Sequence, residues 1–189
     1  DTYLLIANPE AQFDKNSFYL FGSADLRIGY ERQDNRWPYG AELLEGYGKY
    51  EFNPNWNILA GKKVYRWGRG YSFNPVAYGD RPKDVNEMDA SREGYYSAAV
   101  QYNKSFSSTV LKNFSDEMVF LPVYKIINTE YSGEDMFWLL NHSYFLLFDA
   151  DFDLYCTIAR DFDFSLGASA AYTIFPQWEI HGEVSYRPR

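Results

Sequence analysis

The feature that most constrains this chain is a strict alternation of apolar and polar side chains over segments longer than most soluble β-strands. Between residues 18 and 30, one face carries Phe18, Leu20, Leu26 and Ile28, and the opposite face carries Asp25 and Arg27. Successive side chains of a strand point to opposite faces, so this period predicts a strand with one apolar and one polar face. Soluble strands are usually about 5–6 residues long, whereas a tilted membrane-crossing strand needs about 9–11. The segment therefore favours a membrane-crossing strand.

The same alternation recurs along the chain, and its apolar faces tend to begin and end on aromatic residues. It is seen again in residues 44–52, 94–103, 162–174 and 177–186. The chain contains 18 Tyr, 15 Phe and 5 Trp, yet its mean hydropathy is −0.47. Tyrosine combines an apolar ring with a polar tip, which suits a boundary between hydrocarbon and water. Aromatic residues at both ends of apolar faces are typical of the two girdles of a membrane β-barrel.

The connections between the expected strands alternate between short and long. Ten strands are expected, at residues 2–8, 17–31, 40–53, 56–68, 94–103, 106–123, 136–148, 153–160, 162–174 and 177–187. Short connections at residues 53–55, 103–105 and 149–151 alternate with longer ones at 33–39, 69–92 and 125–135, an asymmetry that outer-membrane barrels show. The sequence thus predicts an all-β fold, an antiparallel up-and-down transmembrane β-barrel that forms one domain over residues 1–189. Because the chain starts on a short apolar run and ends without a terminal aromatic residue, we further expect it to be part of a wider barrel.

Several classes of function are disfavoured by composition. The longest purely apolar runs have about five residues, well short of the roughly 20 that a transmembrane helix needs. A net charge of −8 argues against nucleic-acid binding, which depends on Lys and Arg. Cys156 is the single cysteine, and His142 and His181 lack the spacing of metal ligands. Asn141 and Ser143 flank His142, but adjacent strand residues face opposite sides and cannot form a triad by themselves. We therefore expect no enzymatic activity, metal or cofactor.

Cations gather around the start of the longest connection, and two interpretations of them stay open. They could form a constriction that selects anionic solutes, or they could pair with nearby acids and hold a folded-in loop. The candidate pore residues are Lys63, Arg66, Arg69, Arg81, Lys83 and Arg92. The candidate lumen-lining residues are Asp25, Arg27, Glu45, Lys49, Glu179, His181 and Glu183. Phe18, Leu20, Leu26, Ile28, Phe164, Leu166, Ile180 and Val184 are expected to face lipid.

Two local patterns leave alternatives. Lys62 and Arg66 continue the apolar face of residues 56–60, so either a bulge at Gly61 shifts the register or these cations lie above the membrane. The acids between residues 149 and 163 are interpreted as a solvated turn, with oxygen ligands for calcium as the alternative.

Residues 61–84 read GKKVYRWGRGYSFNPVAYGDRPKD. This stretch resembles a Trp-Gly-x-Gly-Tyr-x-x-Asn-Pro-Val motif of poorly characterised outer-membrane barrels, in a setting similar to the alginate-export and related porin-like families of Gram-negative bacteria. Residues 179–183 also resemble a strand of that group. The resemblance implies a barrel in the bacterial outer membrane and no established substrate. Its matching residues are Trp67, Gly68, Gly70, Tyr71, Asn74, Pro75, Val76, Arg81, Pro82, Lys83 and Asp84.

The function expected from the sequence is a porin-like channel for small solutes, with anions as the favoured class. The main alternative is a structural barrel, or a subunit of an outer-membrane complex, without transport activity. A membrane enzyme and a soluble lipocalin-like binder are the remaining alternatives. The expected partners are membrane lipid, small solutes and, as an option, further copies of the chain.

Overall fold

The chain folds into one antiparallel β-sheet. The computed structural model describes residues 2–31, 39–70, 74–81, 93–129, 131, 136–159 and 163–188, and no helix occurs among them. The strands are β1 (Thr2–Ala7), β2 (Glu10–Lys15), β3 (Phe18–Glu31), β4 (Tyr39–Asn53), β5 (Trp56–Lys63), β6 (Tyr95–Ser105), β7 (Leu111–Val123), β8 (Met136–Leu147), β9 (Ala150–Ala159), β10 (Phe164–Phe175) and β11 (Trp178–Tyr186). From β3 to β11, each strand pairs with the next one in the sequence. The predicted all-β, up-and-down order is confirmed.

The first two strands behave as one long strand with an interruption. Ala7 pairs with Leu26 and Glu10 pairs with Ser23, so β1 and β2 share one register along β3. Pro9 lies in the gap and has no backbone N–H to donate, although its carbonyl accepts a bond from Ala24 N at 3.1 Å. The expectation of ten strands missed β2, because the sequence of β2 is mostly polar and resembles a loop.

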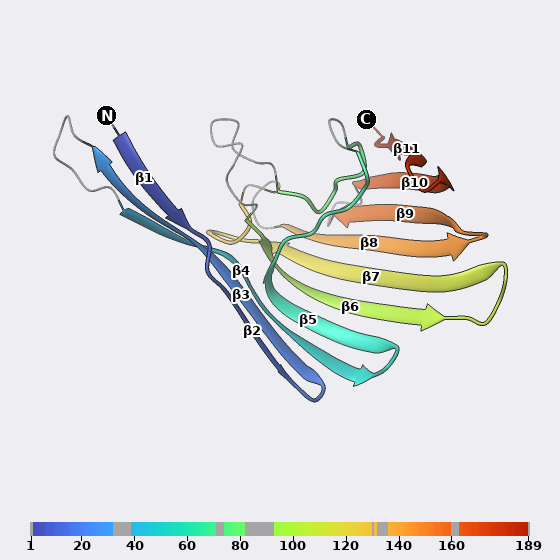
Figure 1. Cartoon of the computed structure of the whole chain (residues 1–189), viewed down its shortest axis with the longest axis horizontal. Helices are drawn as coiled ribbons and strands as arrows, with labels where there is room; N and C mark the ends of the chain where they lie inside the picture. The colour runs from blue at the N-terminus through green and yellow to red at the C-terminus, as the bar shows by residue number, and fades with distance from the viewer. Residues whose placement is uncertain are drawn as a thin grey trace.

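Three expected strand boundaries were wrong. The strand expected at residues 56–68 is β5, and it ends at Lys63 because the chain leaves the sheet there. The strand expected at residues 106–123 is β7, and it begins at Leu111. Residues 106–110 form a turn in which Phe106 N donates to Lys112 O. The strand expected at residues 153–160 is β9, and it begins at Ala150. The alternation of short and long connections is nevertheless present, and it places all long connections at one end of the sheet (Figure 1).

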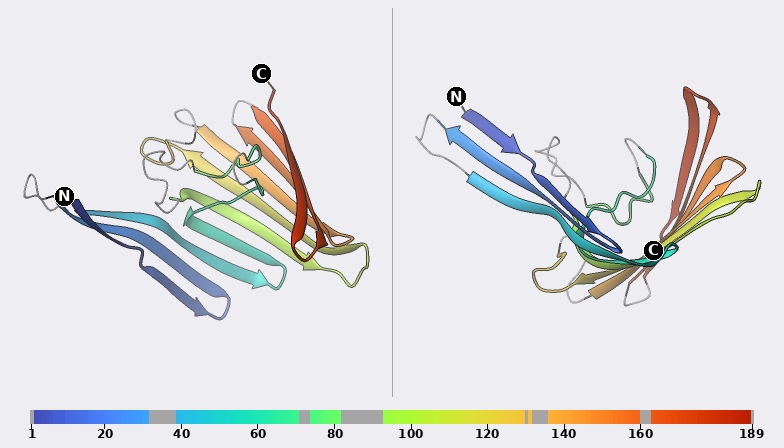
Figure 2. Two further views of the ribbon diagram at one scale, coloured as in Figure 1. Left: turned by 45° about the horizontal axis from the view of Figure 1, so that its top comes forward. Right: turned by 60° about the horizontal axis from the view of Figure 1, so that its bottom comes forward.

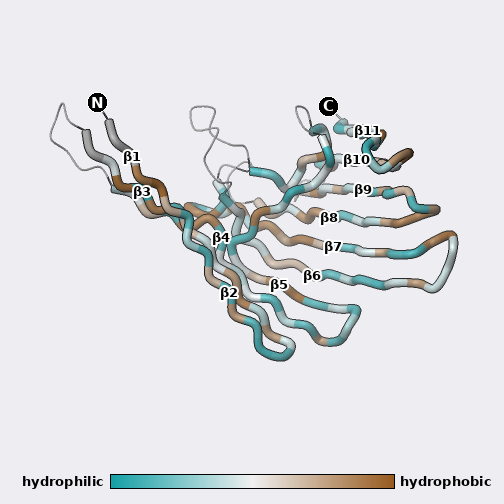
Figure 3. Tube along the Cα trace, viewed as in Figure 1, coloured by the Kyte–Doolittle hydropathy of each residue, from teal (hydrophilic) through white to brown (hydrophobic). Residues whose placement is uncertain are grey.

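The sheet is curved like a gutter, with a concave and a convex face (Figure 2). Its edges are the β1–β2 strand and β11, which do not pair with each other, so the sheet is not closed. The ladder between residues 2–8 and 177–187 that would have marked a complete ten-strand barrel is absent. Apolar and polar residues follow one another along many of the strands (Figure 3).

Large apolar side chains are exposed on the convex face. The eight residues expected to face lipid are 38–65% exposed, the extremes being Phe164 and Val184. The buried apolar residues lie instead between the concave face and a segment that crosses it, and both contribute to them. This core contains Leu59, Tyr65, Trp67, Val76, Tyr78, Tyr95, Val119, Leu121, Val123, Leu140 and Tyr155. An interior of this kind requires a cover, and the connection after β5 supplies it.

Candidate functional site on the concave face

The cover consists of residues 64–70 and 74–81, here called the crossing segment, which runs from β5 across the concave face (Figure 2). Its shape is set by residues of the Trp-Gly-x-Gly-Tyr-x-x-Asn-Pro-Val pattern. Gly68 has φ +84°, and a Cβ there would overlap the Asn74 amide. That amide donates to Trp67 O at 2.7 Å and accepts from Val76 N at 3.2 Å. The pattern therefore closes the segment on itself and turns Trp67 and Val76 into the core.

Aromatic stacking fixes the first half of the crossing segment to β8 and β9. The Trp67 ring lies 5.6 Å from the His142 ring and 6.1 Å from the Tyr155 ring, centre to centre. His142 and Tyr155 stack on each other at 4.8 Å. Tyr65 adds a hydroxyl contact of 2.7 Å with Ser97 on β6. Burial raises the pKa of the Tyr65 phenol, with the Ser97 contact acting in the opposite direction, so this side chain is a neutral anchor.

A charged tether fixes the same half to β9 and β11. The Arg69 guanidinium lies 3.1 Å from Asp151 and 3.7 Å from Asp153. The Glu183 carboxylate accepts bonds from the backbone N–H of Arg69 and of Gly70. Asp153 is itself held by His142 at 2.8 Å and by the Ser169 hydroxyl at 2.9 Å. Charge-assisted bonds of this kind are about twice as strong as neutral ones.

Tyr78 fixes the second half to the last two strands. Its hydroxyl donates to Leu166 O at 2.8 Å and lies 2.7 Å from Ser185 Oγ. The Tyr131 hydroxyl donates to Tyr78 O at 2.8 Å. The ring passes over Gly167, where a Cβ would lie only 2.7 Å from Val76 Cγ1. The segment is thus bound at several points by residues distant in the sequence, on strands β6 and β8–β11 and at Tyr131.

Most of the candidate pore cations within the described residues are paired with acids. Lys63 contacts Glu117 at 3.0 Å, Arg81 contacts Glu93, and Arg69 contacts the two aspartates of β9. Arg66 is exposed and forms no ion pair within the described part of the chain. Lys83 and Arg92 lie outside the described residues. The interpretation of a folded-in loop held by salt bridges therefore fits Lys63, Arg69 and Arg81.

The structure also places Lys62. Pairing continues regularly from Gly61 to Lys62 on the β6 side, so no bulge moves this cation to the concave face. Its ammonium instead donates to Leu43 O at 2.6 Å and to the carboxylate of Glu93, which lies just before β6 in the longest connection. Burial acts to raise the pKa of the Glu93 carboxyl, but the hydrogen bond and charge of Lys62 and the charge of Arg81 outweigh it and lower that pKa.

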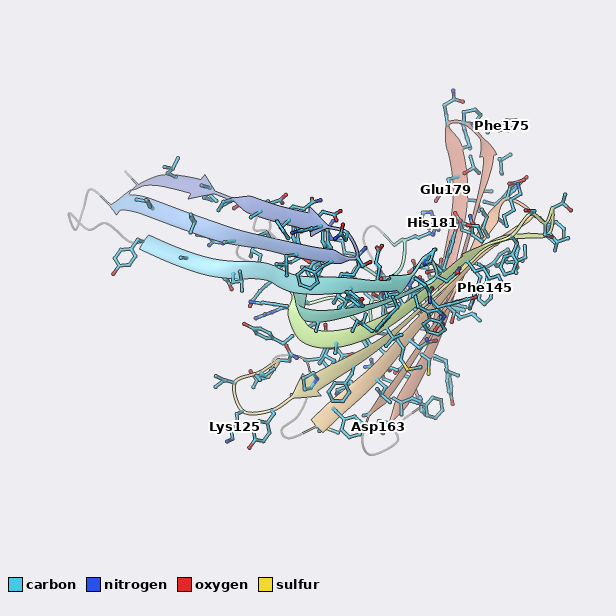
Figure 4. All side chains as sticks on the ribbon, turned by 90° about the horizontal axis from the view of Figure 1, so that it is seen from below. Lys125, Phe145, Asp163, Phe175, Glu179 and His181 are labelled. Carbon is cyan, nitrogen blue, oxygen red and sulfur yellow. The ribbon has the colours of Figure 1, made fainter. Side chains whose placement is uncertain are left out.

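All seven residues expected to line the lumen lie on the concave face. Glu179 and His181 point into it from β11, whereas Phe145 points away (Figure 4). Asp25 pairs with Arg27 at 3.0 Å, and Lys49 pairs with Glu51 at 2.8 Å. Glu45 accepts a bond from Val64 N at 2.7 Å, where the chain leaves β5, and Glu183 holds the crossing segment as described above. The set therefore combines wall residues that pair with neighbours on the same strand, such as His181 with Glu179 at 3.9 Å, and residues that anchor the crossing segment.

Sequence reasoning missed the contacts of Asp151, Asp153 and His142 with the crossing segment. The two aspartates belong to β9 and bind Arg69, so the interpretation as a solvated turn was wrong for them, although Asp149 is an exposed turn residue. The period-two spacing of Asp151, Asp153 and Tyr155 was the available signal. Among the described residues, no cluster of His, Cys, Asp and Glu could hold a metal ion, and no helix is long and apolar enough to cross a membrane.

A cavity of ≈ 1150 Å³ lies between the crossing segment and strands β8–β11. Its wall includes Tyr78, Tyr95, Trp138, Ser165 and Arg187. The concave face thus combines a fixed crossing segment with open volume of the size of small-molecule pockets, which typically measure about 300–1,000 Å³.

Comparisons with known protein families, with curated proteins and with solved structures find no match for this chain. The interpretation of the site therefore depends on its geometry.

Proposed function

We propose that this chain forms the wall and the folded-in loop of a porin-like channel for small solutes in the bacterial outer membrane. The observation that carries the proposal is the sidedness of the sheet. Large apolar side chains are exposed over the whole convex face, while most charged side chains of the strands and the crossing segment lie on the concave face. A soluble sandwich or lipocalin-like protein would bury its apolar face, whereas a membrane barrel turns it toward lipid.

A membrane location requires that both edges of the sheet be paired. Unpaired N–H and C=O groups in hydrocarbon cost several kcal/mol each, so only closed barrels and helices span membranes. The β1–β2 edge and the β11 edge must therefore pair with each other or with further strands. A wider barrel, as expected from the sequence, meets this requirement.

The pairing of Lys63, Arg69 and Arg81 with acids leaves less support for selection of anions than the sequence suggested. On the concave face of β2–β5, the acids Glu10, Asp14, Asp25, Glu42, Glu45 and Glu51 outnumber the cations Arg27, Lys49 and Lys63. We therefore expect the passage to admit small cations and neutral solutes more readily than anions.

A structural barrel without transport activity is the second candidate, and the firm attachment of the crossing segment favours it. Two measurements separate the candidates. The protein, refolded in detergent and mixed with lipid vesicles, should float with the vesicles and show heat-dependent mobility on gels. In planar bilayers a channel gives discrete conductance steps, and a scaffold barrel gives none. If the protein stays soluble without detergent and does not float, both membrane proposals are wrong.

A further inference from the structure

The convex face carries a small group of polar side chains in the middle of two strands. The register sets Asp116 of β7 opposite Ser143 of β8, and Met118 opposite Asn141. The Ser143 hydroxyl donates to Asp116 Oδ1 at 2.6 Å, and the Asn141 amide donates to the same oxygen at 3.1 Å. These three residues are here called the outer polar cluster.

The cluster stands out from the rest of the convex face. Strand parity places every other charged, amide or hydroxyl side chain of the described strands, tyrosines aside, either on the concave face or at a strand end, as with Lys15, Lys62 and Lys104. Asp116 is the single carboxylate on the convex face of those strands. All three mid-strand polar residues of that face therefore touch one another.

Two exposed apolar side chains flank the outer polar cluster. Met118 is 53% exposed and Leu154, which pairs with Ser143, is 52% exposed. Contact between apolar surfaces does not drive association inside a bilayer, because lipid is equally apolar; packing and hydrogen bonds between chains do. A carboxylate on the lipid face is destabilising unless it is paired. Asp116 Oδ2 forms no hydrogen bond or ion pair within the described part of the chain.

We propose that the outer polar cluster is the contact site for a second copy of this chain, related to the first by a two-fold axis along the membrane normal. The cluster is self-complementary. Asp116 Oδ2 offers an acceptor, and Asn141 offers a donor whose second bond, to Glu117 O, is long at 3.4 Å. A two-fold axis sets the donor of each copy against the acceptor of the other. This inference rests on the proposed membrane location.

Cys156 provides the test, because it is the single cysteine and pairs with Asn141 on the same face. The refolded full chain is reconstituted in vesicles and treated with a short bis-maleimide. We expect a cross-linked dimer for the wild type and none for Cys156→Ser. The double variant Cys156→Ser/Val184→Cys moves the thiol to a convex-face position of β11, which is 65% exposed, and should not cross-link.

The variant Asp116→Leu/Ser143→Ala should lower the cross-linked fraction by about tenfold, the equivalent of one or two lost hydrogen bonds. Asp116→Asn keeps hydrogen-bonding atoms and should retain most of the dimer. Flotation and heat-dependent mobility show that each variant is folded and inserted.

Two outcomes overturn the inference while the protein still floats: no cross-link in the wild type, or equal cross-linking through Val184→Cys. A dimer that persists in folded Asp116→Leu/Ser143→Ala has the same consequence. If the wild type does not float, the proposed function is wrong, and the dimer site in the membrane is wrong with it.

Discussion

Replacing Gly167 with alanine tests how the crossing segment is held in place. Gly167 lies on β10 beneath the segment, where a Cβ would meet Val76 Cγ1 at 2.7 Å, the Tyr78 hydroxyl at 3.2 Å and Tyr78 Cε2 at 3.3 Å. Carbon atoms pack at about 3.5–4.0 Å. The added methyl group therefore requires the segment to move by about 1 Å at Val76, a residue with no exposed surface.

The expected magnitude follows from these contacts. Overpacking a well-packed site costs about 1–3 kcal/mol. A shift that breaks the 2.8 Å bond from the Tyr78 hydroxyl to Leu166 O adds about 1 kcal/mol. Docking of the second half of the crossing segment should therefore weaken by about 2–4 kcal/mol.

Gly182→Ala is the matched control, because Gly182 lies on the neighbouring strand β11 and a Cβ there meets nothing within 4 Å. In planar bilayers, Gly167→Ala should give larger or noisier conductance steps than the wild type, and protease should cleave near residues 74–81 more quickly. Gly182→Ala should behave like the wild type. Wild-type conductance and protection in folded Gly167→Ala would refute the reasoning that close packing on Gly167 holds the segment.

Three further predictions concern other parts of the molecule. Ion pairs lower the pKa of Glu93 below its ordinary value of 4.5. The stability that the ionised Glu93 adds to the folded protein is therefore complete above pH 4.5 and is lost as the pH falls further. Glu93→Gln should then lower the unfolding temperature at neutral pH but not in strong acid; an equal loss at both would contradict this. Val184→Arg, on the convex face, should destabilise the protein in vesicles by up to about 2–4 kcal/mol, whereas His181→Arg on the concave face should not; equal urea midpoints would argue against the assigned sides. Arg69→Met removes the cation beside Asp151 and Asp153, so the reversal potential in a salt gradient should shift toward cations, and an unchanged value would show that these acids do not face the passage.

The strands of this protein were largely predictable because their signal is local. Period two links each side chain to its immediate neighbours, and it correctly marked β3, β4, β6, β10 and β11 to within a few residues. It failed for β2, where few apolar residues mark a face. It also extended β5 beyond Lys63, because the alternation continues in residues that leave the sheet.

The contacts of the candidate site were not predictable in the same way. The cations of the longest connection were correctly singled out, and nearby acids were considered as their partners. Arg69 instead pairs with Asp151 and Asp153, which lie more than 80 positions along the chain, and Glu183 holds the backbone of the same segment from β11. Such pairs depend on how the sheet curves, which no local pattern specifies.

The sequence by itself determined the strand order and the two faces of each strand, because alternation and turn length act over neighbouring residues. Only the tertiary structure decided what the concave face contains. Curvature of the sheet brings the segment after β5 over strands β8–β11. Burial, ring contacts of Trp67 and charge-assisted bonds of Arg69 then hold it there in place of contacts with solvent. The pairing register of β7 and β8 places Asp116, Asn141 and Ser143 together on the convex face, although they come from two strands. Contacts between residues distant in sequence arise when packing brings whole strands together, and therefore only the folded sheet reveals them.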